Sequence, residues 1–387
     1  MSKFRFLLLF CLSFFSITAN ANFVFNENCI KAYKNILSLK FNEGALQLAQ
    51  EKKTNPNNKI PVLLENYIDF LKVLTTENNA SFENFKSNKS ARISIIEDDD
   101  KRSPWYLYAA AEINLQSCIN RFKYLEFVSG AYELQKAYKL LEENQKKFPD
   151  FLPNKKSFAL LYGLIGLVPE QYKWALSSIG LKGNTEQGAA MLEDLTQKLP
   201  KSNYAFFYDE SAFFLSFIYL SKEGDPAIYD KVKLVCDAVP KTNLLGVYVK
   251  ALAASKTGHT DDAIEILMER PKMPNYGAFY HLDYLLGLCK LNRFDNDAVI
   301  YFESYLKNYT GNFNIKDAYL KIAWFYLLRG NIDKYNAYIA LCKIRGKAIS
   351  EKDKDAQNLC LQIYPPDIAL LKARLYFDGG NAVLSSN

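Results

Sequence analysis

The chain has two histidines, the residues best suited to metal binding and acid–base catalysis near neutral pH. They are His259 and His281, and they lie far apart along the chain. A helical zinc site needs histidines one turn apart, as in H-E-x-x-H, and this spacing does not provide them. We therefore expect no metal site.

Motifs for a nucleophile or a bound phosphate are also missing. The sequence has no G-x-S-x-G elbow, no Walker-type loop and no G-x-G-x-x-G before a helix. The acidic run Glu97–Asp100 could hold a cation, although a solvated loop explains it more simply. A pair of carboxylates in a cleft is the catalytic arrangement that the sequence leaves open. We expect a protein that is not an enzyme and has no cofactor.

The segment 1–21 has the pattern of a secretory signal peptide. Lys3 and Arg5 precede an apolar run that ends before the small residues Ala19 and Ala21. The run is shorter than the ~20 residues needed to span a bilayer, so we expect no transmembrane span in the mature chain. We predict export to the periplasm or cell surface of a bacterium, since the abundance of Lys, Asn, Tyr, Phe and Ile is typical of a low-GC genome.

Removal of Lys3 and Arg5 with this segment reduces the formal net charge from +6 to +4. This charge is spread along the chain and is too weak to indicate a nucleic-acid partner. Six cysteines remain, at positions 29, 118, 236, 289, 342 and 360. Export permits disulfides, but no C-x-x-C occurs and the surroundings are mostly apolar. Small buried side chains are therefore the favoured interpretation, with disulfides left open.

Helical periodicity fills almost the whole chain after the signal peptide, and no alternating strand pattern occurs. Three regions follow one another. Residues 22–153 form irregular helical hairpins, residues 154–200 form a Gly/Leu-rich helical hairpin segment, and residues 201–387 form repeats. The last repeat is apparently incomplete, because residues 381–387 are too few for its second helix. We expect this end to expose an apolar face, which predicts poor solubility or dimerisation through that end.

The repeats share small or aromatic residues at fixed spacing around a turn glycine. Three glycines, Gly258, Gly330 and Gly380, have the same pattern before them, and Asn292 is predicted to replace the glycine in a fourth copy between the first two. The residues that define the copies are Ala251, Ala254, Gly258, Ala263, Leu286, Ala298, Ala323, Tyr326, Gly330, Ala373, Tyr376 and Gly380. A glycine or asparagine ends the first helix in the left-handed conformation.

The distance from Gly258 to Asn292 sets the expected period of the repeat. It matches the tetratricopeptide repeat, whose period is about 34 residues. We predict an all-α, right-handed superhelix of antiparallel helix pairs.

The middle segment resembles the tetratricopeptide repeat protein 39 family, which includes the fungal inclusion-body clearance proteins. In that family a Gly/Leu-rich helix runs into a Leu-Pro step, followed by a short helix, a glycine-containing turn and a further helix. The matching positions are Gly163, Leu167, Pro169, Ile179, Gly180, Gly183, Asn184 and Gly188. Leu181 and Asn184 depart from the family's preferred Phe and Asp. The resemblance covers the segment 157–195 and implies an all-helical repeat fold with no established catalytic residues.

Two stretches are dominated by apolar or aromatic side chains, residues 158–168 and residues 204–219. The hairpin formed by residues 158–168 and the amphipathic turn from Trp174 to Ile179 could bind a lipid, an acyl chain or a partner helix, although a helix buried in the superhelix is the favoured interpretation. The aromatic run that follows could line the concave face with Tyr204, Tyr208 and Tyr219, although packing between repeats explains most of these rings.

These patterns predict a non-catalytic scaffold that binds a protein or peptide on its concave face. A carrier of an apolar, lipid-like ligand is the alternative. A carbohydrate-handling surface protein is a weaker one.

Overall fold

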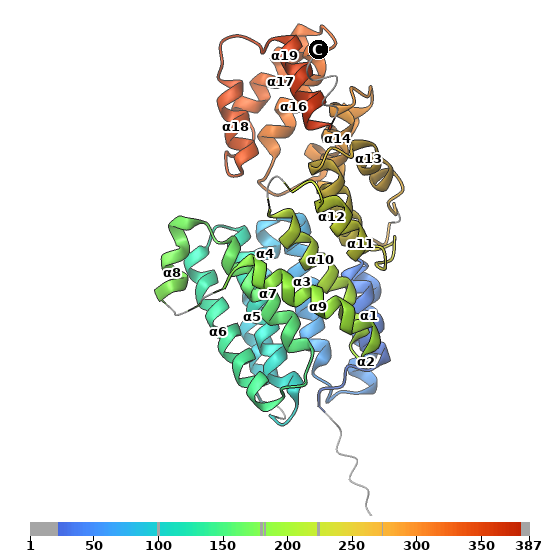
Figure 1. Cartoon of the computed structure of the whole chain (residues 1–387), viewed down its shortest axis with the longest axis vertical. Coiled ribbons are helices and arrows are strands. Elements are labelled where there is room, and N and C mark those ends of the chain that lie inside the picture. Colours follow the sequence, from blue (N-terminus) through green and yellow to red (C-terminus); the bar gives the residue numbers. More distant parts are fainter. Residues whose placement is uncertain are drawn as a thin grey trace, which may run out of the picture.

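The computed structural model describes residues 22–98, 101–178, 181, 183–222, 225–272 and 274–380. These residues form helices and connecting turns, with no strand among them. Neighbouring helices pack in antiparallel pairs, which confirms the predicted all-α solenoid (Figure 1). The signal peptide at residues 1–21 and residues 381–387 of the last repeat lie outside the described residues.

The first helices of the pairs stack on one another in a continuous row. This row comprises α1 (Glu27–Leu37), α3 (Ile60–Thr76), α5 (Pro104–Lys123), α7 (Pro153–Leu167), α10 (Tyr208–Leu220), α12 (Leu244–Lys256), α14 (His281–Asn292), α16 (Ile315–Leu327) and α18 (Glu351–Cys360). The row forms the inner layer of the solenoid.

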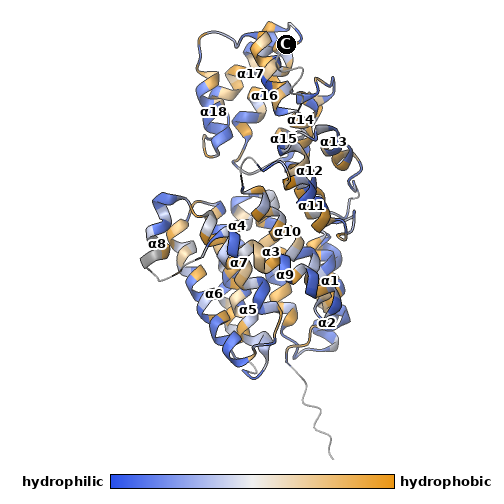
Figure 2. Cartoon of the chain, in the orientation of Figure 1, coloured by the Kyte–Doolittle hydropathy of each residue, from blue (hydrophilic) through white to orange (hydrophobic). Residues whose placement is uncertain are grey.

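The second helices of the pairs form the outer layer. They are α2 (Phe41–Thr54), α4 (Asn79–Glu97), α6 (Phe127–Lys147), α9 (Thr185–Lys198), α11 (Ile228–Cys236), α13 (Thr260–Met268), α15 (Ala298–Asn308) and α17 (Ile332–Ile344). Two helices stand outside this scheme, the short α8 (Lys173–Ser178) and α19 (Ile368–Asp378). In Figure 2 the apolar residues gather on inner helices such as α3 and α10, whereas α2 is mainly hydrophilic.

The helices begin where capping residues satisfy free backbone amides. Asn26, Asn78, Asn184 and Asn243 each accept a hydrogen bond from a backbone N–H in the first turn of α1, α4, α9 and α12. Asn331 does the same for α17. The many asparagines of the sequence thus have a structural use at helix starts.

The turns of the C-terminal repeats follow one another at a constant interval. Gly258 and Gly330 both have positive φ, at 81° and 71°, as predicted. The prediction for Asn292 is wrong, because α14 ends at that residue and Phe294 has the positive φ, at 60°. Phe294 lies midway between the two glycines in the sequence. The sequence could not indicate this position, since phenylalanine rarely adopts the left-handed conformation.

The small residues predicted from the repeat are in the core. Ala251, Ala254, Ala263, Ala298 and Ala323 have no exposed surface. Leu286 is also fully buried, while Tyr326, Ala373 and Tyr376 are half-buried. The small residue of α14 that faces its partner helix is Gly287. A Cβ atom there would lie 3.1 Å from the ring of Phe302 on α15.

The apolar residues form two cores that meet at α14. The larger core runs from Phe23 to Cys289, and the smaller from Tyr284 to Leu375. The lower body in Figure 1, containing α1 to α10, is therefore continuous with the helices above it. No helix in the described part of the chain is long and apolar enough to cross a bilayer.

Candidate functional site: a groove between the inner helices of the C-terminal repeats

The first part of the solenoid closes on itself. The backbone N–H of Gly277, in the connection between α13 and α14, donates a hydrogen bond of 2.7 Å to the carbonyl of Leu39 in the turn after α1. Next to it, Lys40 lies over the ring of Tyr276 at 5.0 Å. These contacts join segments far apart in the sequence, so the wall of helices α1 to α13 ends against its own beginning.

The closed part has a filled interior. Lys156 on α7 is completely buried, and its Nζ atom lies 2.9 Å from Glu112 on α5 and 2.6 Å from Glu210 on α10. Tyr33 on α1 donates a hydrogen bond of 2.5 Å to Glu210, and Tyr67 on α3 donates one of 2.5 Å to Glu112. We call these five residues the central charge cluster. It connects the inner helices α1, α3, α5, α7 and α10.

The central charge cluster is arranged to keep its lysine charged. Burial alone would lower the pKa of Lys156, but the carboxylates of Glu112 and Glu210 outweigh it and raise the pKa well above its usual value. The residues are between 0% and 4% exposed, so the cluster is closed to solvent. Such a site holds helices together and offers no route for a substrate.

The aromatic residues predicted as a possible binding surface pack mainly inside the protein. The ring of Tyr204 contacts Trp105 and Phe151. The Tyr208 hydroxyl donates a hydrogen bond of 2.8 Å to the carbonyl of Val235, and that of Tyr219 donates one of 2.7 Å to Glu193. Trp174 differs, since it is 60% exposed on α8. These contacts favour the interpretation that the three tyrosine rings pack between helices.

The glycines of the family-like motif allow close helix packing. A Cβ atom at Gly188 of α9 would lie 2.7 Å from the carbonyl oxygen of Ala159 on α7, and one at Gly163 would lie 2.8 Å from Ile218 on α10. At Gly183 it would lie 2.6 Å from the Tyr162 ring.

The other motif positions lie around these helices. Asn184 caps α9, Leu167 is the last residue of α7, and Pro169 follows that helix. Ile179 and Gly180 lie outside the described residues.

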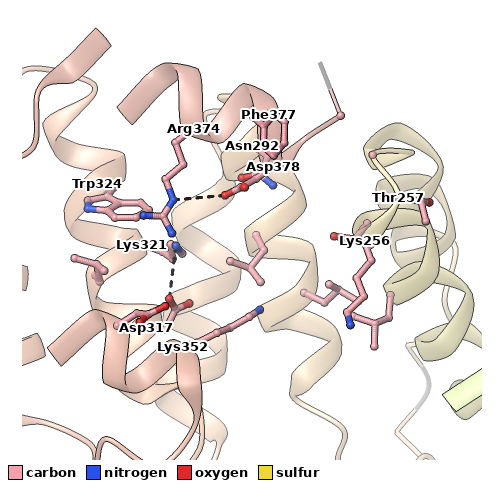
Figure 3. A pocket seen from close by; sticks show the side chains of 18 of the residues that line it. Lys256, Thr257, Asn292, Asp317, Lys321, Trp324, Lys352, Arg374, Phe377 and Asp378 are labelled. Atoms are coloured by element: carbon pink, nitrogen blue, oxygen red, sulfur yellow. Dashed lines mark ion pairs between the residues drawn. The ribbon is translucent and has the colours of Figure 1, made fainter. Parts of the chain in front are cut away.

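An open groove occurs in the C-terminal part, where the solenoid does not close. The groove has a volume of about 710 Å³ and is lined by α12, α14, α16, α18 and α19. Its apolar lining consists of leucines from successive inner helices, at positions 252, 285, 288, 320 and 359, with Trp324 and Phe377. In Figure 3 Lys256 reaches in from α12, on the wall opposite Trp324.

The groove is lined by charged side chains of both signs. Its lining includes five cations (Lys222, Lys256, Lys321, Lys352, Arg374) and four carboxylates (Asp225, Asp317, Asp355, Asp378). Two loose ion pairs lie within it, Lys321 with Asp317 at 3.6 Å and Arg374 with Asp378 at 3.8 Å (Figure 3). Polar groups on both sides of an apolar floor suit a segment of polypeptide better than a hydrocarbon chain.

Two cations of the groove lie close to the ring of Trp324. Lys321 lies 4.0 Å from the centre of this ring and Arg374 lies 5.3 Å from it. Burial lowers the pKa of Lys321, and the positive charges of Arg374 and Lys352 lower it further, while the carboxylates of Asp317 and Asp378 oppose these effects. An anionic group of a ligand would relieve this repulsion.

Helix α19 covers one edge of the groove instead of continuing the stack of helices. It packs on α14, with Leu371 and Leu375 buried. The ring of Tyr376 contacts that of Phe294, and the Thr260 hydroxyl donates a hydrogen bond of 2.9 Å to the carbonyl of Gly379. Apolar side chains around this end of the protein are exposed, namely Ile344, Leu361, Ile363, Tyr364, Leu370 and Phe377. Dimerisation through them stays a prediction.

The two histidines lie in different surroundings and do not approach each other. His259 is exposed in the turn before α13, beside the ring of Tyr229. His281 lies at the start of α14, with its Nε2 atom 3.6 Å from Glu77. Within the described ranges, no group of three or more His, Cys, Asp and Glu side chains is placed to hold a metal ion.

The groove and the central charge cluster were not found from the sequence. The groove combines residues from successive repeats, which no local motif indicates. Comparison with known proteins adds nothing to the assignment, because no protein-family model and no curated protein matches the chain. The resemblance to the tetratricopeptide repeat protein 39 family stays a prediction.

Proposed function

We propose that the chain is a non-catalytic scaffold that binds a segment of another protein in the groove between α12, α14, α16 and α18. The observation that carries this proposal is the lining itself, with five leucines, one tryptophan and nine charged residues of both signs. A volume of about 710 Å³ is in the range of sites that enclose part of a ligand. We also propose that the protein is exported.

The charge pattern favours a peptide over the other ligand classes. Five cations against four carboxylates give no strong positive field for a nucleic acid. A carrier of an apolar ligand would use the segment 157–180 and the aromatic helix 204–220. The core buries Leu160 and Leu161 of the first and Phe213 and Phe214 of the second. The carrier and carbohydrate hypotheses stay untested, and the observations on the groove do not favour them.

Photo-crosslinking in cells tests the proposal. A photoreactive phenylalanine analogue placed at Leu288, which is half-buried in the groove, should give a recurrent protein adduct. The matched control is Ile300, which is 59% exposed on the outer helix α15 and should give none. Equal adduct yields from the two positions, or no protein adduct from Leu288, would reject the groove as the binding site. If native mass spectrometry of the purified protein showed bound lipid, that result would instead favour a carrier of an apolar ligand.

A further inference from the structure

Two of the cysteines lie side by side on neighbouring helices. Cys342 on α17 has no exposed surface and Cys360 on α18 is 1% exposed. Both thiols are free, and the Cys360 thiol is close enough to raise the pKa of the Cys342 thiol. In addition, the Cys342 Sγ atom lies 3.8 Å from the carbonyl oxygen of Ala356, one turn before Cys360 on the same helix. The two thiols therefore share one small site between packed helices.

The other cysteines of the described residues have different neighbours. Cys29 contacts the amide of Asn58 at 3.6 Å, and Cys236 contacts the hydroxyl of Ser216 at 3.4 Å. Cys289 lies beside the hydroxyl of Ser255. Cys118 lies near the charges of Glu133, Lys89 and Arg121. None of the four is placed next to a second thiol, so the pair at 342 and 360 stands apart.

We propose that Cys342 and Cys360 form a disulfide bond that joins α17 to α18. The oxidant is a disulfide, either a small molecule such as oxidised glutathione or an exchange protein. The Cys360 thiolate attacks it, forms a mixed disulfide and releases one thiolate. The Cys342 thiolate then attacks the Cys360 sulfur, closes the new S–S bond and releases the second thiolate. The cysteines lose two electrons and the oxidant gains them, while the two cysteine protons pass to the released thiolates.

The bond must form before the helices are fully packed. Burial and the neighbouring thiol raise the pKa of Cys342 above its ordinary value, so the folded, reduced protein has little reactive thiolate there. The predicted signal peptide would bring the chain, still unfolded, into an oxidising compartment, which is where disulfides persist. The proposal does not depend on what the groove binds.

A disulfide at this position would fix one wall of the groove. Helix α18 contributes Lys352, Asp355 and Leu359 to the lining, and the connection from α17 runs through residues 345–350. Closing the loop from 342 to 360 restricts the unfolded chain and so stabilises this helix pair. The groove would keep its width without a further repeat packed on α18.

Oxidative refolding of the full chain tests the proposal. The protein is reduced, unfolded, refolded in a mixture of reduced and oxidised glutathione, and alkylated. We expect a cross-linked peptide containing Cys342 and Cys360, lighter than the two free peptides by two hydrogens, with the other cysteines alkylated. Cys342→Ser should abolish the cross-link, whereas Cys289→Ser should leave it unchanged. Alkylation of both cysteines, mixed disulfides with glutathione, or linkage to other cysteines would overturn the proposal.

Two further measurements keep the test decisive if refolding fails. Cell-free synthesis in oxidised glutathione forms the bond during folding and needs no denaturation, and the same peptide map applies. The oxidised protein should also melt roughly 5 °C higher than the reduced one. The double variant Cys342→Ala/Cys360→Ala should melt at the same temperature with or without reductant. If reductant lowered the melting temperature of this variant as much as that of the unaltered protein, the stabilisation would come from another disulfide bond.

Discussion

The backbones of Gly258 and Gly380 lie directly against each other, although they belong to turns far apart in the sequence. A Cβ atom at Gly258 would lie 2.7 Å from the Cα atom of Gly380. Both residues have positive φ, at 81° and 77°. The contact places the end of α19 on the turn between α12 and α13, and so positions Arg374, Phe377 and Asp378 at the edge of the groove.

Gly258→Ala should release α19 from the groove edge. The new methyl group meets backbone atoms, which cannot move aside as a flexible side chain can, and the positive φ adds strain of about 1–2 kcal/mol. We expect faster hydrogen exchange and proteolysis across residues 368–378 while α1 to α10 stay protected. The matched control is Gly330→Ala, because Gly330 has a positive φ of 71° but no atom within 4 Å of a Cβ. The Gly330→Ala variant should show the effect of backbone strain alone. Equal rates of hydrogen exchange in α19 of both variants would contradict the packing role of Gly258.

Lys352→Glu should weaken binding in the groove. Lys352 is an exposed residue of α18 that lines the groove with Lys321 and Arg374, so its reversal removes positive charge from the lining. We expect a several-fold lower yield of the protein adduct from Leu288, and a weaker interaction at high salt. Lys354→Glu is the control, because Lys354 is exposed on the same helix, pairs with Glu351 and is not part of the lining. An equal loss of adduct in both variants would indicate a general effect of the protein's net charge.

Replacing Lys156 by Met should destabilise the closed part of the solenoid. The change leaves the carboxylates of Glu112 and Glu210 buried without their cation, at a cost of about 3–5 kcal/mol. A lower melting temperature in thermal unfolding checks this. Adding Glu112→Gln and Glu210→Gln should recover part of the loss, since two buried charges are then removed.

The control for Lys156 is a surface ion pair. Lys198 lies 2.6 Å from Asp194, but both side chains are about half exposed. Lys198→Met should therefore change the melting temperature little. If Lys156→Met behaved in the same way, the central charge cluster would not stabilise the fold.

The fold could be predicted because its determinants are local. Helical periodicity and the buried alanines at 251, 263 and 323 specify helix pairs within a single repeat. The turn at Phe294 was missed because it depends on a non-glycine residue in the left-handed conformation, which tertiary packing imposes. The predicted period is consequently too short, since it was measured to Asn292 instead of Phe294.

The sites could not be predicted because they combine distant residues. One signal was nevertheless present, since Glu112 and Glu210 each interrupt an apolar or aromatic helical stretch, which requires a buried partner. Which partner each has depends on the order in which α5, α7 and α10 stack. The groove also depends on the position of α19, which does not continue the stack of inner helices. No residue of α19 indicates this position in the sequence.

His281 should make the protein less stable in mild acid. It lies in a cluster at the junction of α3 and α14, where Glu77 also pairs with Lys123 at 2.5 Å and accepts a hydrogen bond from Tyr309. Burial lowers the pKa of His281 to about 4, although the Glu77 carboxylate opposes this. Lys123 and Lys352 lower it slightly further.

The lowered pKa of His281 sets the direction in which stability changes with pH. Between pH 6.5 and about 4 the unfolded chain binds a proton at His281 and the folded chain does not, so stability falls as the pH falls through this window. The full effect is about 3 kcal/mol. Denaturant unfolding at several pH values should show that the unaltered chain takes up one proton more on unfolding than the His281→Gln variant does.

His259→Gln is the control for this measurement, because His259 is exposed in a turn. It should keep the pH dependence of the unaltered chain, while His281→Gln should flatten it between pH 6.5 and about 4. Since Glu77 joins α3 to α15 through Tyr309, opening at acid pH should begin at this junction. Hydrogen exchange should therefore increase first around residues 77 and 309. A curve for His281→Gln that coincides with that of the unaltered chain would exclude His281 as the titrating group.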